Sequence, residues 1–293
     1  MPEDAYPYQD AGLPAEQRTE DLLSRLPLAD KVGLMFHTIA LPADVDQVVP
    51  LFGERSLRSL LSKGLRHFNI LGSLPDGRSF AQWHNSVQQA ALQHPMGSPV
   101  TFSSDPRHHF GDNPLTQMMA GPFSLWPEPL GLAAIGSDAR VREFADIVRQ
   151  EYLAVGIRVA LHPQLDVATE PRWSRINTTF GEDADLTSRL GVAYVGGLQG
   201  ARLGSDSVAA MVKHFPGGGP QRDGDDPHFA WGREQVYPGH NAAYHLRPFR
   251  AALDAGAAEV MPYYGMPVGT EWDEVGFGFN KSVIAGLLRK QLG

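Results

Sequence analysis

Short apolar runs alternate with amphipathic helical segments along most of the chain, and this alternation limits the fold more than any other feature. The apolar runs, which predict buried strands, lie at 66–71, 98–104, 158–167, 207–213 and 258–264. Segments with helical periodicity lie at 15–36, with a break near Pro27, and at 138–155, 183–202, 245–255 and 281–292. Strands that alternate with helices pair in parallel through right-handed crossovers. We therefore predict an α/β fold.

A nucleotide-binding sheet is one α/β architecture, and a barrel is another. The first is marked by a Gly-x-Gly-x-x-Gly turn after an early strand or by a Walker loop. Neither occurs here, and the run Gly217-Gly218-Gly219 lies in neither context. A (β/α)₈ barrel needs ~250 residues, which a chain of 293 residues accommodates. We therefore expect a TIM-type (β/α)₈ barrel.

Composition excludes several classes of protein. The 25 basic and 33 acidic residues give a net charge of −8, which leaves no basic excess for a nucleic-acid partner. The absence of cysteine excludes a disulfide scaffold, a thiol nucleophile and a cysteine-ligated zinc site.

The N-terminus lacks the basic start and apolar core of a signal peptide. No stretch reaches the ~18 apolar residues that a membrane span needs. We therefore expect a cytoplasmic protein with no membrane partner, although a trimmed N-terminus would leave secretion open.

Polar side chains follow the predicted strands at the points where those strands end. In a parallel barrel such positions meet at the C-terminal rim, where active sites form. Any one of them can instead be a strand-end cap, but their recurrence favours a common site. The residues are Asp105, Asp166, Lys213, His214, Tyr263 and Tyr264.

The segment 171–183 is dense in arginine, tryptophan and carboxylates. A guanidinium such as that of Arg175 presents a fork of donors suited to vicinal hydroxyls, and an aromatic face suits the apolar side of a sugar ring. The alternative is structural: an Arg–Glu ion-pair network that holds a loop, with Asp183 capping the next helix. We expect both to be partly true.

The histidines also permit a metal interpretation. A metal site would require several histidines to lie close together in the fold, and the candidates are His108, His109, His162, His214 and His228. However, adjacent histidines rarely bind one ion, and no His-x-x-x-His lies on a helix. The acidic run 223–226 lacks the spacing of a calcium loop. We predict no metal and no cofactor.

Several of these segments, in their order along residues 15–293, resemble glycoside hydrolase family 3. Lys213-His214-Phe215-Pro216-Gly217 is the most specific of them. The others are Gly156 through Asp166, Pro171-Arg-Trp-x-Arg175, Phe180-Gly-Glu-Asp183, Val260-Met-Pro-x-Tyr264 and the closing helix that ends at Gly293.

The resemblance implies an exo-acting, retaining β-glycosidase of the β-glucosidase type, with a β-linked oligosaccharide or glycoside as substrate. The position that matches the family's sugar-binding carboxylate is Asp105. The other residues that would surround the terminal sugar are Arg175, Lys213, His214 and Tyr264, with Trp231 as a wall.

The chain departs from the family pattern at its end. The family's nucleophilic aspartate follows the next strand, which would lie beyond Gly293, and most members take the acid/base from a C-terminal α/β domain. We therefore expect residues 1–293 to be a C-terminally truncated barrel domain that lacks its last strands. We expect this fragment to be inactive alone.

Two rival functions remain open. One branch of the family, the β-N-acetylhexosaminidases, uses an Asp-x-His dyad as general acid/base, and Asp226-Pro227-His228 has that spacing. The residues that flank this dyad do not resemble that branch, nor does the run 106–109 after Asp105, so a substrate-lining loop or a solvated turn is the alternative. The third possibility is a non-catalytic, carbohydrate-binding barrel fragment.

Overall fold

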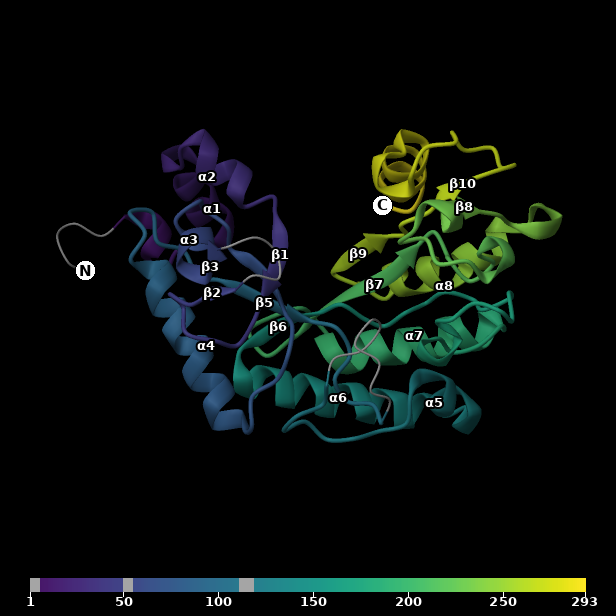
Figure 1. Cartoon of the computed structure of the whole chain (residues 1–293), viewed down its shortest axis with the longest axis horizontal. Coiled ribbons are helices and arrows are strands. Elements are labelled where there is room, and N and C mark those ends of the chain that lie inside the picture. Colours follow the sequence, from purple (N-terminus) through teal and green to yellow (C-terminus); the bar gives the residue numbers. More distant parts are fainter. Residues whose placement is uncertain (1–5, 50–54, 111–118) are drawn as a thin grey trace. The chain divides into compact units, whose positions relative to one another are not determined.

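The computed structural model describes residues 6–49, 55–110 and 119–293. The chain divides into two compact units, Met1–Ser103 and Ser104–Gly293. Figure 1 labels their helices and strands. Residues 111–118, which belong to a long stretch without periodicity, lie outside the described residues.

The first unit contains a parallel arrangement of β1 (His37–Ala40), β4 (His67–Ile70) and β5 (Thr101–Ser104), with β4 between the other two. The 16-residue helix α4 (Gly77–Leu92) has Asp76 as its N-cap. The Asp76 side chain accepts a hydrogen bond from the backbone N–H of Ser79. The remaining elements are short: α1 (Ala15–Arg25), α2 (Leu28–Gly33), α3 (Leu57–Leu61) and the antiparallel pair β2 (Val48–Val49) and β3 (Arg55–Ser56).

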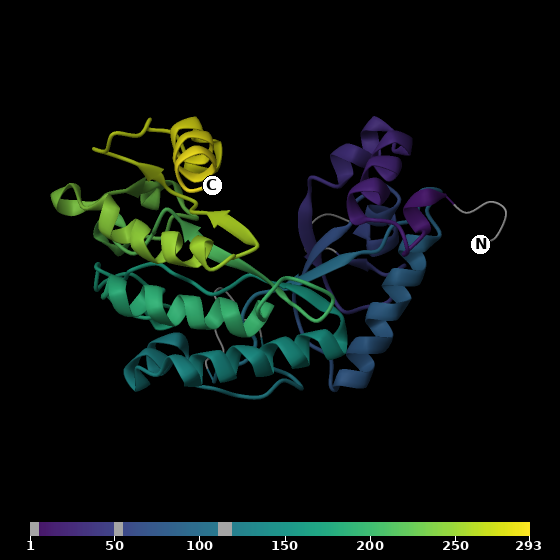
Figure 2. The same cartoon turned by 180° about the vertical axis from the view of Figure 1, so that it is seen from behind.

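The second unit is built on the parallel strands β6 (Ile157–Ala160), β7 (Ala209–Phe215) and β9 (Glu259–Pro262), with β7 in the middle. Helix α7 (Ala184–Gln199) packs against both α6 (Asp138–Val155) and α8 (Ala242–Asp254), and Figure 2 shows α6 and α7 side by side. The smaller elements are α5 (Pro129–Ile135), the parallel pair β8 (Glu234–Gln235) and β10 (Met266–Pro267), and a π-type helix at Ser282–Gln291.

Helix α6 shows how the sequence pattern produces the packing. Ser137 caps its start, and Gly156 ends it with a φ of 85°, a conformation that glycine adopts without strain. The apolar side chains that recur every three or four residues are fully buried, and each contributes about 1.5–3 kcal/mol of burial free energy. They are Val141, Phe144, Val148 and Tyr152.

Most predicted elements are confirmed, with differences at their ends. The strand predicted over 158–167 ends at Ala160, and beyond it only an isolated bridge between Gln164 and Lys213 continues the pairing. The helix predicted over 15–36 breaks at Pro27 as expected, but the side predicted as apolar is not buried as a whole: Leu26 is buried, whereas Met35 is exposed. Helices α4 and α5 and strand β1 were not predicted from the sequence.

The α/β fold with parallel strands is therefore confirmed. Within the described residues, we find no helix that combines the length and the hydropathy needed to cross a bilayer.

Candidate functional site

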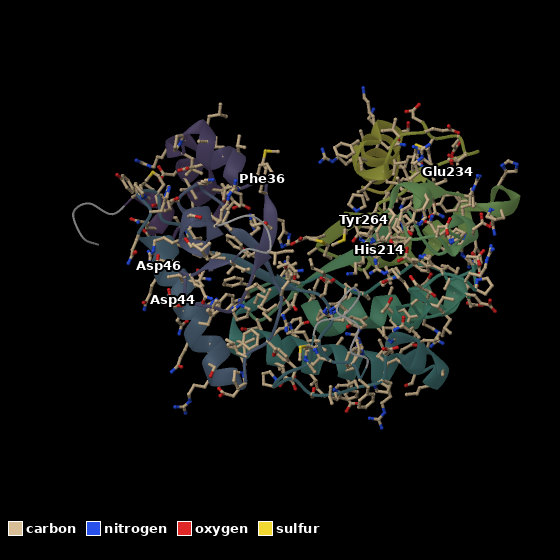
Figure 3. All side chains as sticks on the ribbon, in the orientation of Figure 1. Phe36, Asp44, Asp46, His214, Glu234 and Tyr264 are labelled. Atoms are coloured by element: carbon tan, nitrogen blue, oxygen red, sulfur yellow. The ribbon has the colours of Figure 1, made fainter. Side chains whose placement is uncertain are left out.

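All the predicted site residues lie in the second unit, and four of them follow or end a strand. Asp105 follows the last residue of β5, Lys213 and His214 lie near the end of β7, and Tyr264 comes two residues after β9. Figure 3 shows His214 and Tyr264 beside one another, with their ring centroids 5.2 Å apart. The expected gathering of these side chains at strand ends is therefore seen in the structure.

Backbone hydrogen bonds hold the segments that carry these residues. The N–H of Leu161 donates to the carbonyl of Ser104 at 2.9 Å, and the N–H of Leu165 donates to the carbonyl of Lys213 at 2.6 Å. The N–H of Tyr263 donates to the carbonyl of Phe215 at 2.7 Å. The site residues therefore start from fixed main-chain positions, which reduces the conformational entropy lost when a ligand binds.

Lys213 and Asp105 form an ion pair, with Nζ and Oδ1 separated by 2.6 Å. The lysine side chain is 4% exposed and the aspartate side chain 21% exposed. Burial lowers the pKa of Lys213, and the carboxylate of Asp105 acts against this shift. The pair places a donor and an acceptor side by side, with the carboxylate partly exposed.

His214 pairs with a second carboxylate, that of Asp166. Nδ1 of His214 lies 2.9 Å from Oδ2 of Asp166, and both side chains are completely buried. Burial and the charge of Arg175 lower the pKa of His214 to about 3, although Asp166 opposes the shift. The imidazole is therefore neutral near neutral pH. The peptide bond between Lys213 and His214 is cis.

Arg175 lies in the same cluster. Its Nη2 atom is 3.2 Å from Oε1 of Gln164, which also accepts a hydrogen bond from Thr178 Oγ1 at 2.9 Å. Burial raises the pKa of the Tyr264 phenol, and the charge of Arg175 and its hydrogen bond to Tyr264 lower it in part. Arg175 therefore lies between the Gln164 amide and the Tyr264 ring.

Three buried polar atoms of this cluster have no hydrogen-bond partner in the described structure. They are Nε of Arg175, Nε2 of Gln164 and Nε2 of His214. A buried polar atom left unpaired costs about 1–3 kcal/mol, and native proteins leave few such atoms. A ligand that both donates and accepts hydrogen bonds, as a polyhydroxylated molecule does, can pair with all three atoms.

Sequence reasoning missed Gln164 and left Asp166 out of the substrate-binding set. Both belong to the segment 162–166 at the end of a predicted strand, so their position was the available signal. Gln164 is uncharged, so its residue type alone does not suggest a site. Its role is visible only from its contacts, because Arg175 and Thr178 both donate to its amide oxygen.

Asp226 and His228 form the pair that their spacing suggested, with Oδ1 and Nδ1 2.6 Å apart. Both side chains are exposed, and the His228 ring lies 4.7 Å from that of Tyr264. Trp231 is 69% exposed and stacks on Phe229 with ring centroids 4.6 Å apart. Its role as a wall of the site stays a prediction.

Segment 171–183 contains both an Arg–Glu ion pair that holds a loop and an arginine that lies in the candidate site. Arg172 forms an exposed ion pair with Glu170 at 2.8 Å and a second with Asp223 at 3.2 Å, and hydrogen bonds from Arg172 lower the pKa of Glu170 to about 2. Asp183 caps α7 through the N–H of Leu186. Arg172 and Asp183 thus hold the loop and the start of the helix, whereas Arg175 lies in the cluster with Gln164 and Tyr264.

The histidines considered for a metal have other neighbours. His108 lies 2.9 Å from Glu151, His109 lies 3.0 Å from the carbonyl of Pro127, and His162 lies between the hydroxyls of two tyrosines. Over the ranges that the structure covers, no three histidine, aspartate or glutamate side chains are arranged to hold a metal ion.

Comparisons with known proteins identify the family of the chain. Residues 59–293 match the family model described as glycosyl hydrolase family 3 N terminal domain. Beta-glucosidase C of Emericella nidulans is 49% identical over 292 residues, which are 99% of this chain and 47% of that protein. The periplasmic beta-glucosidase/beta-xylosidase of Dickeya chrysanthemi is 41% identical over 304 residues, covering 98% of this chain and 45% of that protein.

Solved structures give the same result. A glycoside hydrolase family 3 beta-N-acetylglucosaminidase from Paenibacillus sp. superimposes with a TM-score of 0.76 at 26% identity, covering 92% of this chain and 48% of that one. A beta-glucosidase from Listeria innocua, at 24% identity, shares the fold with a TM-score of 0.74, covering 94% of this chain and 35% of that one. The chain spans about half the length of the curated relatives it matches. It belongs to glycosyl hydrolase family 3, and residues 59–293 correspond to that family's N-terminal domain.

Proposed function

We propose that this cluster is the sugar-binding subsite of an exo-acting, retaining β-glycosidase of the β-glucosidase type. The observation that carries the proposal is the group of unpaired buried atoms on Arg175, Gln164 and His214 next to the Lys213–Asp105 pair. Transfer of a neutral sugar from water into a buried site is favourable only if its hydroxyls form hydrogen bonds with protein donors and acceptors of this kind. The names of the relatives, which include beta-glucosidases, support the choice of substrate.

Each residue has a role in this proposal that follows from its chemistry. Asp105 accepts hydrogen bonds from hydroxyls of the terminal, non-reducing sugar, and its charge makes these bonds stronger than neutral ones. Lys213 and Arg175 donate to the same sugar. Tyr264 lies over His214, where its ring bounds the subsite.

The reacting groups belong to the proposal as well. A retaining mechanism needs two carboxyl groups about 5–5.5 Å apart, one nucleophile and one acid/base. We place both in the part of the relatives' length that this chain does not span, together with the last barrel strands and a C-terminal α/β domain. On this proposal residues 1–293 form an incomplete (β/α)₈ barrel without turnover of its own.

A β-N-acetylhexosaminidase is the second candidate. It is favoured by the contact of 2.6 Å between Asp226 and His228, in which the carboxylate can orient the imidazole for proton transfer. The structural neighbour from Paenibacillus is named for this activity.

Nitrophenyl β-glycosides of glucose, xylose and N-acetylglucosamine test these proposals, offered to the 293-residue chain and to the longest form that its gene encodes. We expect hydrolysis of the glucoside by the longest form and none by the chain alone. Saturable hydrolysis by the purified chain would refute the placement of the nucleophile. A preference for the N-acetylglucosaminide that His228→Ala abolishes would favour the second candidate. Glucose binding without hydrolysis by either form would indicate a carbohydrate-binding protein.

A cytoplasmic location is part of the same proposal. One relative, from Dickeya chrysanthemi, is named periplasmic. Cell fractionation of the native host decides between the two compartments.

A further inference from the structure

Asp166 contacts the proposed subsite without being available to a ligand. Its side chain is completely buried, and both of its oxygens accept hydrogen bonds from the protein. Oδ2 accepts from Nδ1 of His214 at 2.9 Å and from the backbone N–H of His214 at 3.3 Å. Oδ1 accepts from the backbone N–H of Gly218. The carboxylate thus holds one side of the imidazole and the turn that follows β7.

These contacts determine which nitrogen of His214 carries the proton. Burial raises the pKa of Asp166, but the attraction of His214 and the hydrogen bonds from His214 and Gly218 outweigh it, so the pKa lies below its ordinary value. The carboxylate is therefore ionised and can only accept hydrogen bonds. Because the imidazole is neutral and has a single proton, that proton lies on Nδ1.

The other ring nitrogen is then an acceptor. Nε2 of His214 is buried and has no hydrogen-bond partner among the described residues. The nearby Lys213 and Arg175, whose charges both act on this imidazole, can only donate. A hydroxyl can donate to Nε2 while it accepts from one of these cations, whereas an ether oxygen or a methylene cannot.

We propose that Asp166 is a positioning residue, which fixes His214 in the Nδ1–H tautomer and so presents Nε2 as an acceptor for a ligand hydroxyl. The identity of that ligand as a sugar rests on the proposed function, whereas the tautomer is a property of the free chain. The site then selects for a hydrogen-bond donor such as a hydroxyl at this point, because a group without a donor leaves the buried nitrogen unpaired.

Nitrogen NMR of the chain labelled with ¹⁵N-histidine measures the tautomer directly, and a His214→Gln spectrum assigns the signals. We expect a protonated Nδ1 and an unprotonated Nε2 on His214 from pH 7 down to pH 5.5. A proton on Nε2, or a doubly protonated ring at pH 5.5, would overturn the proposal. This measurement reads the tautomer in the unmodified chain and needs no activity.

Asp166→Ala removes the acceptor, and Asp105→Ala is its matched control in the same cluster. In Asp166→Ala we expect the Nε2–H tautomer to appear and glucose to bind at least tenfold more weakly. In Asp105→Ala we expect weaker glucose binding with the tautomer unchanged. A folded Asp166→Ala chain that keeps His214 only as Nδ1–H would contradict the positioning role. If the variant does not fold, the wild-type spectrum decides.

Glucose as the probe separates this inference from the proposed function. If His214 is Nδ1–H but glucose shifts none of its signals and does not bind, the role of Asp166 is supported and the sugar subsite is wrong. If glucose binds while His214 is Nε2–H, the subsite is supported and the role of Asp166 is wrong.

Discussion

Nζ of Lys213 lies 2.6 Å from Oδ1 of Asp105, although 108 residues separate the two in the sequence. The lysine is almost completely buried, and a buried charge without a partner is strongly destabilising. Asp105 therefore has two tasks. It compensates Lys213 in the free protein, and on the proposed function it accepts hydrogen bonds from a sugar.

Asp105→Ala should weaken ligand recognition far more than it weakens the fold. Two charged hydrogen bonds of about 1.5–3 kcal/mol each correspond to a loss of about 10²–10⁴ at 1.4 kcal/mol per tenfold. We expect that loss in glucose affinity, measured by calorimetry, or in kcat/KM of any form that hydrolyses β-glucosides. The loss of stability should be smaller, because Lys213 can release its proton when its partner is gone.

Asp183→Asn is the control for this change. Asp183 caps α7 from an exposed position, and asparagine caps a helix about as well as aspartate. Affinity and melting temperature should stay near those of the unmodified chain. A near-normal affinity in Asp105→Ala, with normal folding, would show that the sugar-binding assignment is misplaced.

The two arginines of the segment 172–175 provide a matched pair. Arg175 is buried against Gln164, whereas Arg172 pairs with Glu170 at the surface. Arg175→Lys should reduce glucose affinity at least tenfold, because an ammonium cannot reproduce the planar fork of donors. Arg172→Lys should leave affinity unchanged and cost at most about 1 kcal/mol of stability, as exposed ion pairs do. Equal effects of the two variants on glucose binding would remove Arg175 from the site.

Helix α6 was predictable from its local pattern. The period of Val141, Phe144 and Val148 together with the stop at Gly156 identifies α6 almost to the residue. Helix α4 has a similar pattern that also predicts a helix, namely the N-cap Asp76 and the apolar residues Phe80 and Val87. Strand β1 has only four residues and no fully apolar run, so its sequence does not mark it as a strand. It is recognised as one only through its parallel pairing with β4.

The site was predictable as a set of residue types but not as a set of contacts. Strand-end position and resemblance selected Lys213 and His214, yet neither reveals which carboxylate each residue meets. Lys213 pairs with Asp105 and His214 pairs with Asp166 because of the order of the strands, which is a long-range property. The unpaired amide of Gln164 is visible only after its neighbours are placed.

Gly219→Ala should destabilise the turn after β7. A Cβ at this position would lie 1.9 Å from the carbonyl oxygen of Val167, which is backbone and cannot rotate away. We expect a loss of about 1–3 kcal/mol or more in the free energy of unfolding, as overpacking produces. Gly278→Ala, where a Cβ meets nothing within 4 Å, should leave stability almost unchanged. Thermal unfolding of both variants checks the prediction, and equal melting temperatures would contradict the close approach.

Acid should destabilise the second unit through its buried histidines. Burial lowers the pKa of His109 to about 4, whereas an unfolded histidine titrates near 6.5. The unfolded state therefore binds more protons between pH 6.5 and 4, so stability is complete above pH 6.5 and falls as the pH drops through this window. This single group accounts for a loss of the order of 3 kcal/mol. In His109→Gln the fall in unfolding free energy between pH 7 and pH 4.5, measured by urea titration, should be smaller by about that amount. An identical pH dependence in His109→Gln and the unmodified chain would show that His109 is not held neutral by the fold.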